Sequence, residues 1–240
     1  MKICYNFPLL RTISLFFSLL GLSAIPFFAQ SQTLVWEEHF TDAAPNPNRW
    51  TYDFGNGSQR AAGWGWGNQE LEYYTSRSEN VRIENGILII EARKENFDGS
   101  GFTSGRIKTE GRVHFQYGTV EARIKIPNLN NGLWPAFWTL GTVGTGWPSI
   151  GEIDILEAGS AAALAAGKGN SRVTSATHWS NTAGDHEYAS DYEDAAVNLS
   201  EDYHLYKMVW TSQSIKTYID NVEIYSFSLT GANAAQLTEF

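Results

Sequence analysis

The chain has 240 residues, and its 26 acidic and 17 basic residues give a formal net charge of −9 at pH 7. A chain this acidic repels phosphate backbones and anionic lipid surfaces, which argues against nucleic acid as a partner. Its length fits one domain of ordinary size, large enough for the core of a β-sandwich.

The first 31 residues are predicted to be a secretory signal peptide. Lys2 and Arg11 precede an apolar run, residues 13–28, that contains no acid, and Ala29-Gln30-Ser31 has the small-x-small pattern of a cleavage site. The run is too short and wrongly flanked for a membrane-spanning helix, with an uncleaved anchor as the alternative. We therefore expect residues 1–31 to take no part in the fold.

Cleavage would leave residues 32–240 as a secreted domain, extracellular or periplasmic, with no membrane attachment. The only cysteine, Cys4, lies in the leader, so the mature chain can form neither a disulfide nor a thiolate metal site. Loss of Lys2 and Arg11 changes the formal net charge from −9 to −11. An acidic surface of this kind suits a neutral glycan better than a sulfated or uronic one.

Short alternating segments separated by turn residues recur along the mature chain. The expected strands are residues 34–40, 81–83, 87–93, 105–110, 118–127, 152–157, 172–179, 204–210, 214–219 and 222–227. Residues 94–103 and 180–199 are expected to be polar loops, the second at the edge of a cleft, and the alanine-rich residues 159–170 a loop rather than a short helix. Many short strands with regular turns predict an all-β sandwich.

Residues 151–159 contain three carboxylates, Glu152, Asp154 and Glu157, separated by aliphatic residues and closed by a glycine at each end. Alternation at the start of this segment predicts a strand with its acids on one face. Glu157 breaks the alternation, and a one-residue β-bulge between Asp154 and Glu157 would restore it. Two leaning Glu side chains could then approach the ~5–5.5 Å separation of a retaining glycosidase pair. The alternative is a set of solvated acids, although like charges on one strand face disfavour each other.

This Glu-x-Asp-x-x-Glu pattern resembles the signature of family 16 glycoside hydrolases, in the bulged form of laminarinases (endo-1,3-β-glucanases). The supporting segments are Gly132-Leu133-Trp134-Pro135-Ala136-Phe137-Trp138-Thr139-Leu140-Gly141, Thr177-His178-Trp179 and Asn68-Gln69-Glu70-Leu71-Glu72-Tyr73-Tyr74. The resemblance covers most of the chain from residue 34 to residue 227. It implies a concanavalin-like jelly-roll β-sandwich with a substrate cleft on the concave sheet.

The resemblance also implies catalytic roles for the three acids. Glu152 would be the nucleophile that forms a glycosyl-enzyme intermediate, and Glu157 the general acid and then the general base. Asp154 would orient Glu152, and its charge would help raise the pKa of Glu157. On this reading the chemistry needs no cofactor.

Five further residues are candidates for substrate binding. Trp134 and Trp138 would share a face if they lay on one strand, and beside acids we favour a platform for sugar rings over core packing. The resemblance implies sugar contact for both tryptophans and a position near the nucleophile for His178. It places Asn68 and Arg106 at cleft positions that bind sugar hydroxyls, with a structural role as the alternative. The roles of Trp64 and Trp66 stay open.

The sequence therefore predicts a secreted, retaining endo-β-glucanase that hydrolyses β-1,3 or mixed β-1,3/1,4 glucans such as laminarin. We expect a monomer whose partner is a neutral polysaccharide. One alternative is a hydrolase or transglycosylase for another polysaccharide on the same machinery. The other is a non-catalytic carbohydrate-binding module or lectin, which would need the aromatic residues but not all three acids.

The C-terminus departs from the family pattern. Relatives usually continue beyond the position of Phe240 with an apolar strand, a Gly-Gly turn and a final strand carrying Asp-Tyr-Val, so we expect this chain to lack its C-terminal strands. The resemblance also implies a structural calcium ion. Glu38 and Gly86 match the upstream positions of that site but the aspartate is missing, so the metal ligands remain unknown.

Overall fold

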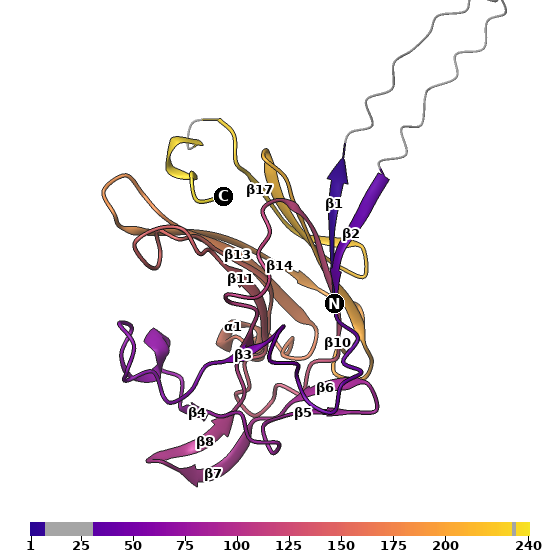
Figure 1. Cartoon of the computed structure of the whole chain (residues 1–240), viewed down its shortest axis with the longest axis vertical. Coiled ribbons are helices and arrows are strands. Elements are labelled where there is room, and N and C mark those ends of the chain that lie inside the picture. The colour runs from indigo at the N-terminus through magenta and orange to yellow at the C-terminus, as the bar shows by residue number, and fades with distance from the viewer. Residues whose placement is uncertain (8–30, 232–233) are drawn as a thin grey trace, which may run out of the picture. The chain divides into compact units, whose positions relative to one another are not determined.

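The computed structural model describes residues 1–7, 31–231 and 234–240 (Figure 1). These residues form two compact units, which we call the first unit (residues 1–37 and 116–240) and the second unit (residues 38–115). The acidic segment belongs to the first unit. Among the described residues, no helix reaches the length and apolarity that a membrane crossing needs.

The first unit contains two antiparallel sheets. The six-stranded sheet has the order β17-β16-β15-β10-β1-β2, and its strands are β1 (Lys2–Phe7), β2 (Ser31–Glu37), β10 (Gly118–Ile124), β15 (His204–Trp210), β16 (Ser214–Ile219) and β17 (Val222–Ser228). The four-stranded sheet has the order β11-β12-β13-β14, and its strands are β11 (Ala136–Leu140), β12 (Glu152–Glu157), β13 (Arg172–Ser180) and β14 (His186–Asp194). The helical segments are α1 (Ala161–Ala165) and the 3₁₀ turn η2 (Ala234–Gln236).

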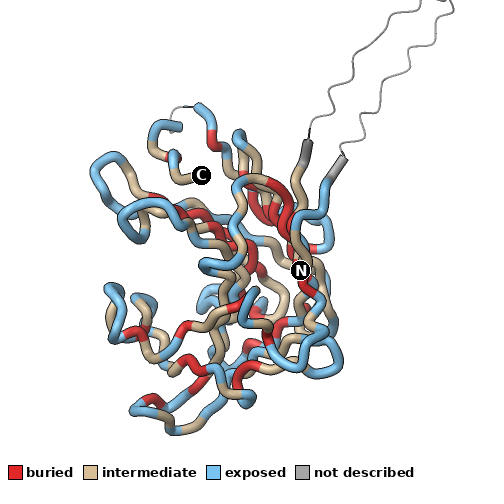
Figure 2. The backbone as a smooth tube through the Cα atoms, viewed as in Figure 1, coloured by how far each residue is buried: buried red, intermediate tan, exposed pale blue. Residues whose placement is uncertain are grey.

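The core of the first unit lies between these sheets. Alternate residues of β12 and β13 pack towards β15 and β17, and the buried stretches are red in Figure 2. Ile155, Val173 and Tyr206 are among its fully buried side chains. Buried hydroxyls also join the layers, since Thr177 Oγ1 lies 2.6 Å from Tyr225 Oη. The predicted all-β sandwich is confirmed.

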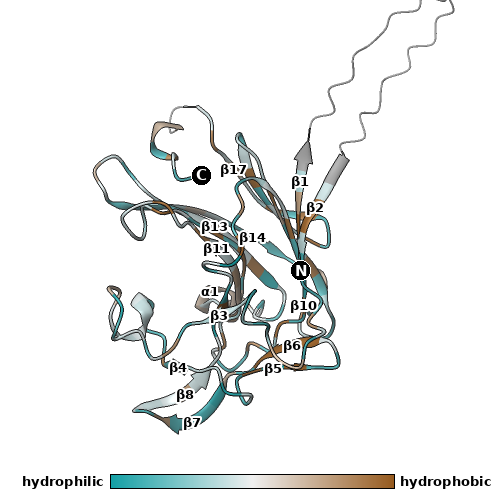
Figure 3. Cartoon of the chain, in the orientation of Figure 1, coloured by the Kyte–Doolittle hydropathy of each residue, from teal (hydrophilic) through white to brown (hydrophobic). Residues whose placement is uncertain are grey.

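The second unit is built from short strands. They are β3 (Thr51–Tyr52) with β9 (Ile107–Lys108), β4 (Glu72–Tyr74) and β7 (Arg93–Phe97) on either side of β8 (Ser100–Ser104), and the hairpin of β5 (Val81–Glu84) with β6 (Ile87–Ile90). Its 3₁₀ segment, η1, spans Trp64–Gly67. The predicted turn of the β5–β6 hairpin is confirmed, because Asn85 and Gly86 have φ of 53° and 76°. Figure 3 shows the contrast between the apolar strand β6 and the hydrophilic strand β7.

Three segments that we expected to be irregular are ordered elements. Residues 94–103 form the hairpin of β7 and β8, whose turn uses Asp98 and Gly99 at φ of 45° and 84°, an Asp-Gly signal of the same kind as Asn85-Gly86. Residues 180–199 contain strand β14, which pairs along its full length with β13. Residues 159–170 contain α1, which begins where the hydroxyl of Ser160 accepts a hydrogen bond from the backbone N–H of Ala163.

The N-terminal residues also differ from the expectation. Lys2–Phe7 does not stay outside the fold but forms β1 between β10 and β2 (Figure 1). The reason is burial, because Ile3 is 2% exposed and pairs with Val120. The apolar run of the predicted leader lies outside the described residues, and its cleavage stays a prediction.

The chain end at Phe240 packs against the first unit. The Phe240 ring is buried, its carbonyl accepts a hydrogen bond from Trp210 Nε1 at 3.2 Å, and the neighbouring Glu239 carboxylate accepts one from Ser180 N at 3.1 Å. The expectation that C-terminal strands are lacking stays a prediction.

The hairpin that leads into the acidic strand depends on a close backbone approach at Gly141. Its N–H donates to Gly151 O at 2.9 Å, and a Cβ at this position would lie 1.5 Å from Ile150 O. We expect Gly141→Ala to lower the free energy of unfolding by at least about 2 kcal/mol, measured by urea denaturation. Gly101→Ala is the matched control, because its Cβ would meet nothing within 4 Å. Equal stability of the two variants would contradict the importance of this approach.

Candidate active site

The three carboxylates lie on one face of β12, as the spacing predicted. On the neighbouring strand β13, Glu152 is opposite His178, Asp154 is opposite Ala176, and Glu157 is opposite Thr174. Three steps along β12 from Asp154 to Glu157 therefore match two steps along β13. This register shift confirms the predicted one-residue bulge.

The bulge is held from inside the sandwich. Ile155 and Leu156 are consecutive residues and both are buried, which regular alternation would not allow. The carbonyl of Ile155 accepts a hydrogen bond from Ser175 Oγ at 2.9 Å, and Ser175 Oγ accepts one from Thr217 Oγ1 at 2.8 Å. A chain of buried hydroxyls thus connects the bulge on β12 to strand β16 in the opposite sheet.

Burial makes all three acids difficult to ionise. Glu157 is partly buried, and desolvation raises its pKa to about 7, with a further contribution from the charge of Asp154. Desolvation also raises the pKa of Glu152 and of Asp154, and each acid is affected by the other. The expected effect of Asp154 on Glu157 is present, but burial is the larger cause.

Each glutamate accepts a hydrogen bond from a tryptophan indole. Trp134 Nε1 donates to Glu157 Oε1 at 3.0 Å, and Trp147 Nε1 donates to Glu152 Oε2 at 3.0 Å. Each bond stabilises the ionised carboxylate and lowers its pKa against the larger effect of desolvation. Both tryptophans are about half exposed, so their rings also present apolar surface.

The two tryptophans predicted to share a face both reach the face that carries the acids, but only Trp138 lies on the strand. Trp138 lies on β11 opposite Asp154, whereas Trp134 precedes the first residue of that strand, Ala136. Pro135 stands between Trp134 and the strand, and proline cannot donate to a sheet ladder. Trp134 is consequently free to turn its indole N–H towards Glu157.

His178 contacts the central acid. Its Nε2 lies 3.1 Å from Asp154 Oδ2, an oxygen that has no well-directed hydrogen bond among the described residues. His178 is also the register partner of Glu152, the residue predicted to be the nucleophile, and its contact with substrate stays a prediction.

Sequence reasoning missed three residues of this face: Trp147, His186 and Tyr188. Trp147 had a usable signal, because it lies only five residues before Glu152 in the loop that enters β12. His186 and Tyr188 lie on β14, in a segment that we expected to be a loop. Their proximity to His178 follows from the pairing of β13 with β14.

Asn68 and Arg106 belong to the second unit and are engaged within it. Asn68 Nδ2 donates to Glu70 Oε1 at 3.2 Å, and Arg106 Nε lies 3.2 Å from Asp53 Oδ2. The Arg106 guanidinium also covers the ring of Trp66 at 4.9 Å. These contacts agree with the structural alternative, and substrate binding by either residue stays a prediction.

The environments of Trp64 and Trp66 also differ. Trp66 packs against Tyr74, with ring centroids 5.5 Å apart, whereas Trp64 is 55% exposed. Trp66 is therefore packed within the second unit, whereas the side chain of Trp64 is exposed to solvent.

The described residues contain one group of side chains close enough to share a metal ion: Glu152, Asp154 and His178, whose ligand atoms lie within 4.8 Å of one another. The Glu38 carboxylate, near which the resemblance implied calcium, instead accepts hydrogen bonds from Phe40 N and Trp50 Nε1 and pairs with Arg49. These contacts engage its carboxylate, and a structural calcium ion stays a prediction.

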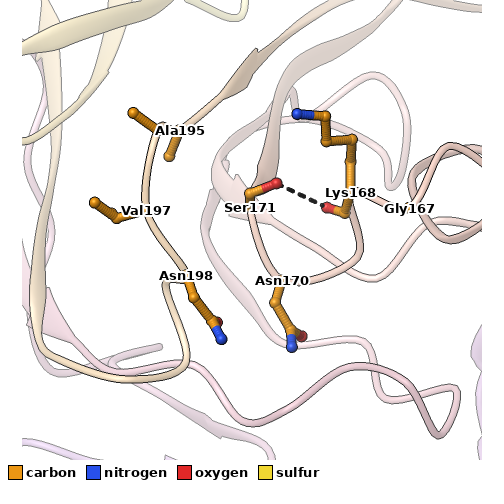
Figure 4. Close-up of a pocket in the computed structure, with 8 residues that line it drawn as sticks. Gly167, Lys168, Asn170, Ser171, Ala195, Val197 and Asn198 are labelled. Atoms are coloured by element: carbon orange, nitrogen blue, oxygen red, sulfur yellow. Dashed lines mark hydrogen bonds between the residues drawn. The ribbon is translucent and has the colours of Figure 1, made fainter.

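A separate hollow of about 300 Å³ lies beyond the Arg172–Asp194 end of β13 and β14 (Figure 4). Lys168 and Ser171 line it, with a hydrogen bond from the hydroxyl of Ser171 to the Lys168 carbonyl, and the remaining lining consists of small, apolar and amide side chains. Its lining residues do not include any of the three acids of β12.

Two glutamates on one sheet face, on either side of a bulge, agree with the paired carboxylates that a glycoside hydrolase requires. The model of the glycosyl hydrolases family 16 matches residues 67–238. The chain belongs to this family.

Several proteins of known kind are similar to the chain. A beta-glucanase of Rhodothermus marinus is 36% identical over 203 residues, which is 81% of this chain and 65% of the relative. The clotting factor G alpha subunit of Tachypleus tridentatus is 34% identical over 200 residues, which is 82% of this chain but 27% of the relative. The crystal structure of a laminarinase from Flavobacterium sp. UMI-01 has a TM-score of 0.70 and 34% identity, covering 87% of this chain and 83% of that one. The chain thus spans less than two thirds of the length of the beta-glucanase and of the clotting factor G alpha subunit.

Buried Glu157 makes the stability of the fold dependent on pH. Because its pKa is raised in the folded state, the folded protein binds this proton more tightly than the unfolded chain does. The contribution of Glu157 to stability is therefore largest at low pH and is lost as the pH rises from its ordinary pKa of 4.5 to about 7. At pH 8 the ionised carboxylate costs roughly 3 kcal/mol.

We expect Glu157→Gln to be more stable than the wild type at pH 8 and equally stable at pH 4, measured by thermal unfolding. Glu79→Gln, at an exposed position of the second unit, is the control and should leave both curves unchanged. A destabilised Glu157→Gln at pH 8 would show that the carboxylate is not desolvated.

Proposed function

We propose that the chain is a retaining endo-β-glucanase that hydrolyses β-1,3 or mixed β-1,3/1,4 glucans such as laminarin. One observation carries the proposal: Glu152 and Glu157 flank a bulge on one sheet face, and each accepts an indole hydrogen bond. Family membership and the likeness to a beta-glucanase and a laminarinase support the substrate class.

In this proposal Glu157 begins the reaction as the general acid. Its pKa of about 7 keeps a proton on the carboxyl at neutral pH, and that proton passes to the glycosidic oxygen as the bond breaks. After the leaving sugar departs, the ionised Glu157 takes a proton from the water that hydrolyses the intermediate.

Glu152 acts as the nucleophile and must be ionised when substrate binds. The charge of the neighbouring Asp154 raises the pKa of Glu152, so the two adjacent buried carboxyls titrate as a pair. The indole N–H of Trp147 opposes this rise, since it stabilises the charged form of Glu152. Glu152 then forms the covalent glycosyl-enzyme bond.

The exposed aromatic rings support a glycan substrate. Trp134 offers a half-exposed apolar surface immediately beside the acid, where a pyranose ring could stack. We further propose that Trp138, which lies opposite Asp154, and His178, which lies opposite Glu152, contact the sugar. Secretion and a monomeric state complete the proposal, and the acidic composition favours a neutral polysaccharide.

Laminarin hydrolysis tests the proposal. We expect release of reducing sugar, with newly formed ends that first have the β configuration in ¹H NMR, as double displacement requires. Glu152→Gln should lower kcat by about 10³-fold or more while laminarin binding persists. Binding without hydrolysis by the wild type would favour a carbohydrate-binding module. Activity confined to another polysaccharide, or transfer to sugar acceptors, would favour the other alternative.

Two indole replacements should move opposite limbs of the pH–rate profile. Trp134→Phe removes the hydrogen bond that lowers the pKa of Glu157. Glu157 then stays protonated to higher pH, and the basic limb of the profile shifts to higher pH. Trp147→Phe removes the bond that lowers the pKa of Glu152, so the nucleophile ionises at higher pH and the acidic limb moves up.

The measurement is kcat/KM against pH for both variants, and each variant serves as the control for the other. Identical shifts in the two profiles would contradict the separate roles of Glu152 and Glu157.

A further inference from the structure

His186 lies beside His178, which contacts Asp154, and beside Trp147, which donates a hydrogen bond to Glu152. The proposed mechanism gives His186 no role. It is the first residue of β14, where it pairs with Ser180, so its side chain lies on the same sheet face as His178. Its Nε2 lies 2.9 Å from His178 Nδ1. On its other side, its ring centroid lies 4.5 Å from that of Trp147.

The two imidazoles meet edge to edge. Their planes are only 17° apart, and their centroids are separated by 5.1 Å while two of their nitrogens are separated by 2.9 Å. A face-to-face stack would bring the centroids closer, so this geometry fits a hydrogen bond directed along the rings. One proton occupies the space between the two nitrogens.

These contacts connect Asp154, His178, His186 and Trp147 in a line. His178 contacts Asp154 through Nε2 and His186 through Nδ1, so its two nitrogens serve different partners. A neutral His178 that is protonated on Nε2, the nitrogen facing Asp154, has an unprotonated Nδ1, which can only accept a hydrogen bond from His186. A donor on His186 therefore favours the tautomer of His178 that turns an N–H towards Asp154.

We propose that His186 is a positioning residue for the hydrolysis: it fixes the tautomer and orientation of His178 and supports the ring of Trp147, so that one side chain steadies the partners of both Asp154 and Glu152. This inference rests on the proposed function for its kinetic consequence, but the histidine pair exists independently of any substrate.

The pair also governs the charge that the acids experience. Burial and the charge of His178 lower the pKa of His186, and Glu187 opposes this effect. Tyr188 on β14 is the other titratable side chain packed against both rings, and Glu152 is the nearest acid beyond Trp147. Positive charge on His178 lowers the pKa of Glu152 and of Glu157.

Two variants separate the hydrogen bond from the packing. His186→Phe keeps a planar ring beside Trp147 but removes both nitrogens. His186→Gln loses the ring but can place an amide nitrogen where Nε2 lies, and so preserves a donor to His178.

We expect His186→Phe to lower kcat on laminarin about tenfold with KM changed less than about twofold, as for the loss of one hydrogen bond to a charged network. His186→Gln should recover most of the activity. The proposal is overturned if the Gln variant is as impaired as the Phe variant.

The ¹⁵N spectrum of the imidazoles tests the pair without substrate. We expect His178 to be protonated on Nε2 at pH 8 in the wild type and in His186→Gln, and to become a mixture of tautomers in His186→Phe. An unchanged tautomer in the Phe variant would overturn the positioning role. A wild type that shows the pair in the spectrum but hydrolyses no glucan would contradict the proposed function alone.

Discussion

One extra residue in β12 is the constraint on which the site depends. In a regular strand, Glu157 would point into the sandwich with Ile153 and Ile155, because side chains alternate between faces. The bulge between Asp154 and Glu157 brings the last acid back to the face of the first two. It also turns the two aliphatic residues Ile155 and Leu156 into the core. A single insertion thus serves the packing of the interior and the grouping of charge outside it.

The grouped charge would be unfavourable without the side chains that surround it. Burial raises the pKa of each acid, while indole donors limit that rise at Glu152 and Glu157. The donors are uncharged, so they orient the carboxylates without neutralising them as an arginine would. The result is a set of acids that titrate near neutrality, which is where acid and nucleophile roles can separate.

The sequence predicted what local rules determine. Alternation and parity located β12 and its bulge, and glycine-containing turns located the β5–β6 hairpin. The sequence prediction failed where pairing between distant segments determines the secondary structure. The residues of β14 are polar and were predicted to be a loop, because only the pairing with β13 makes them a strand. The position of His186 was therefore not predicted. The Asp98-Gly99 turn was a readable signal that the polar residues around it obscured. The sequence did not predict β1, because the burial of Ile3 is a tertiary effect.

The chain of hydroxyls from Thr217 through Ser175 to the carbonyl of Ile155 connects the six-stranded sheet to the bulge. A bulged carbonyl has lost its ladder partner, and a buried one needs another donor. Because that donor is anchored on β16, small changes on this strand can tilt the backbone between the two glutamates. Natural drift or directed evolution could therefore adjust the positions of the two carboxyls without replacing any residue on the face of β12 that carries them.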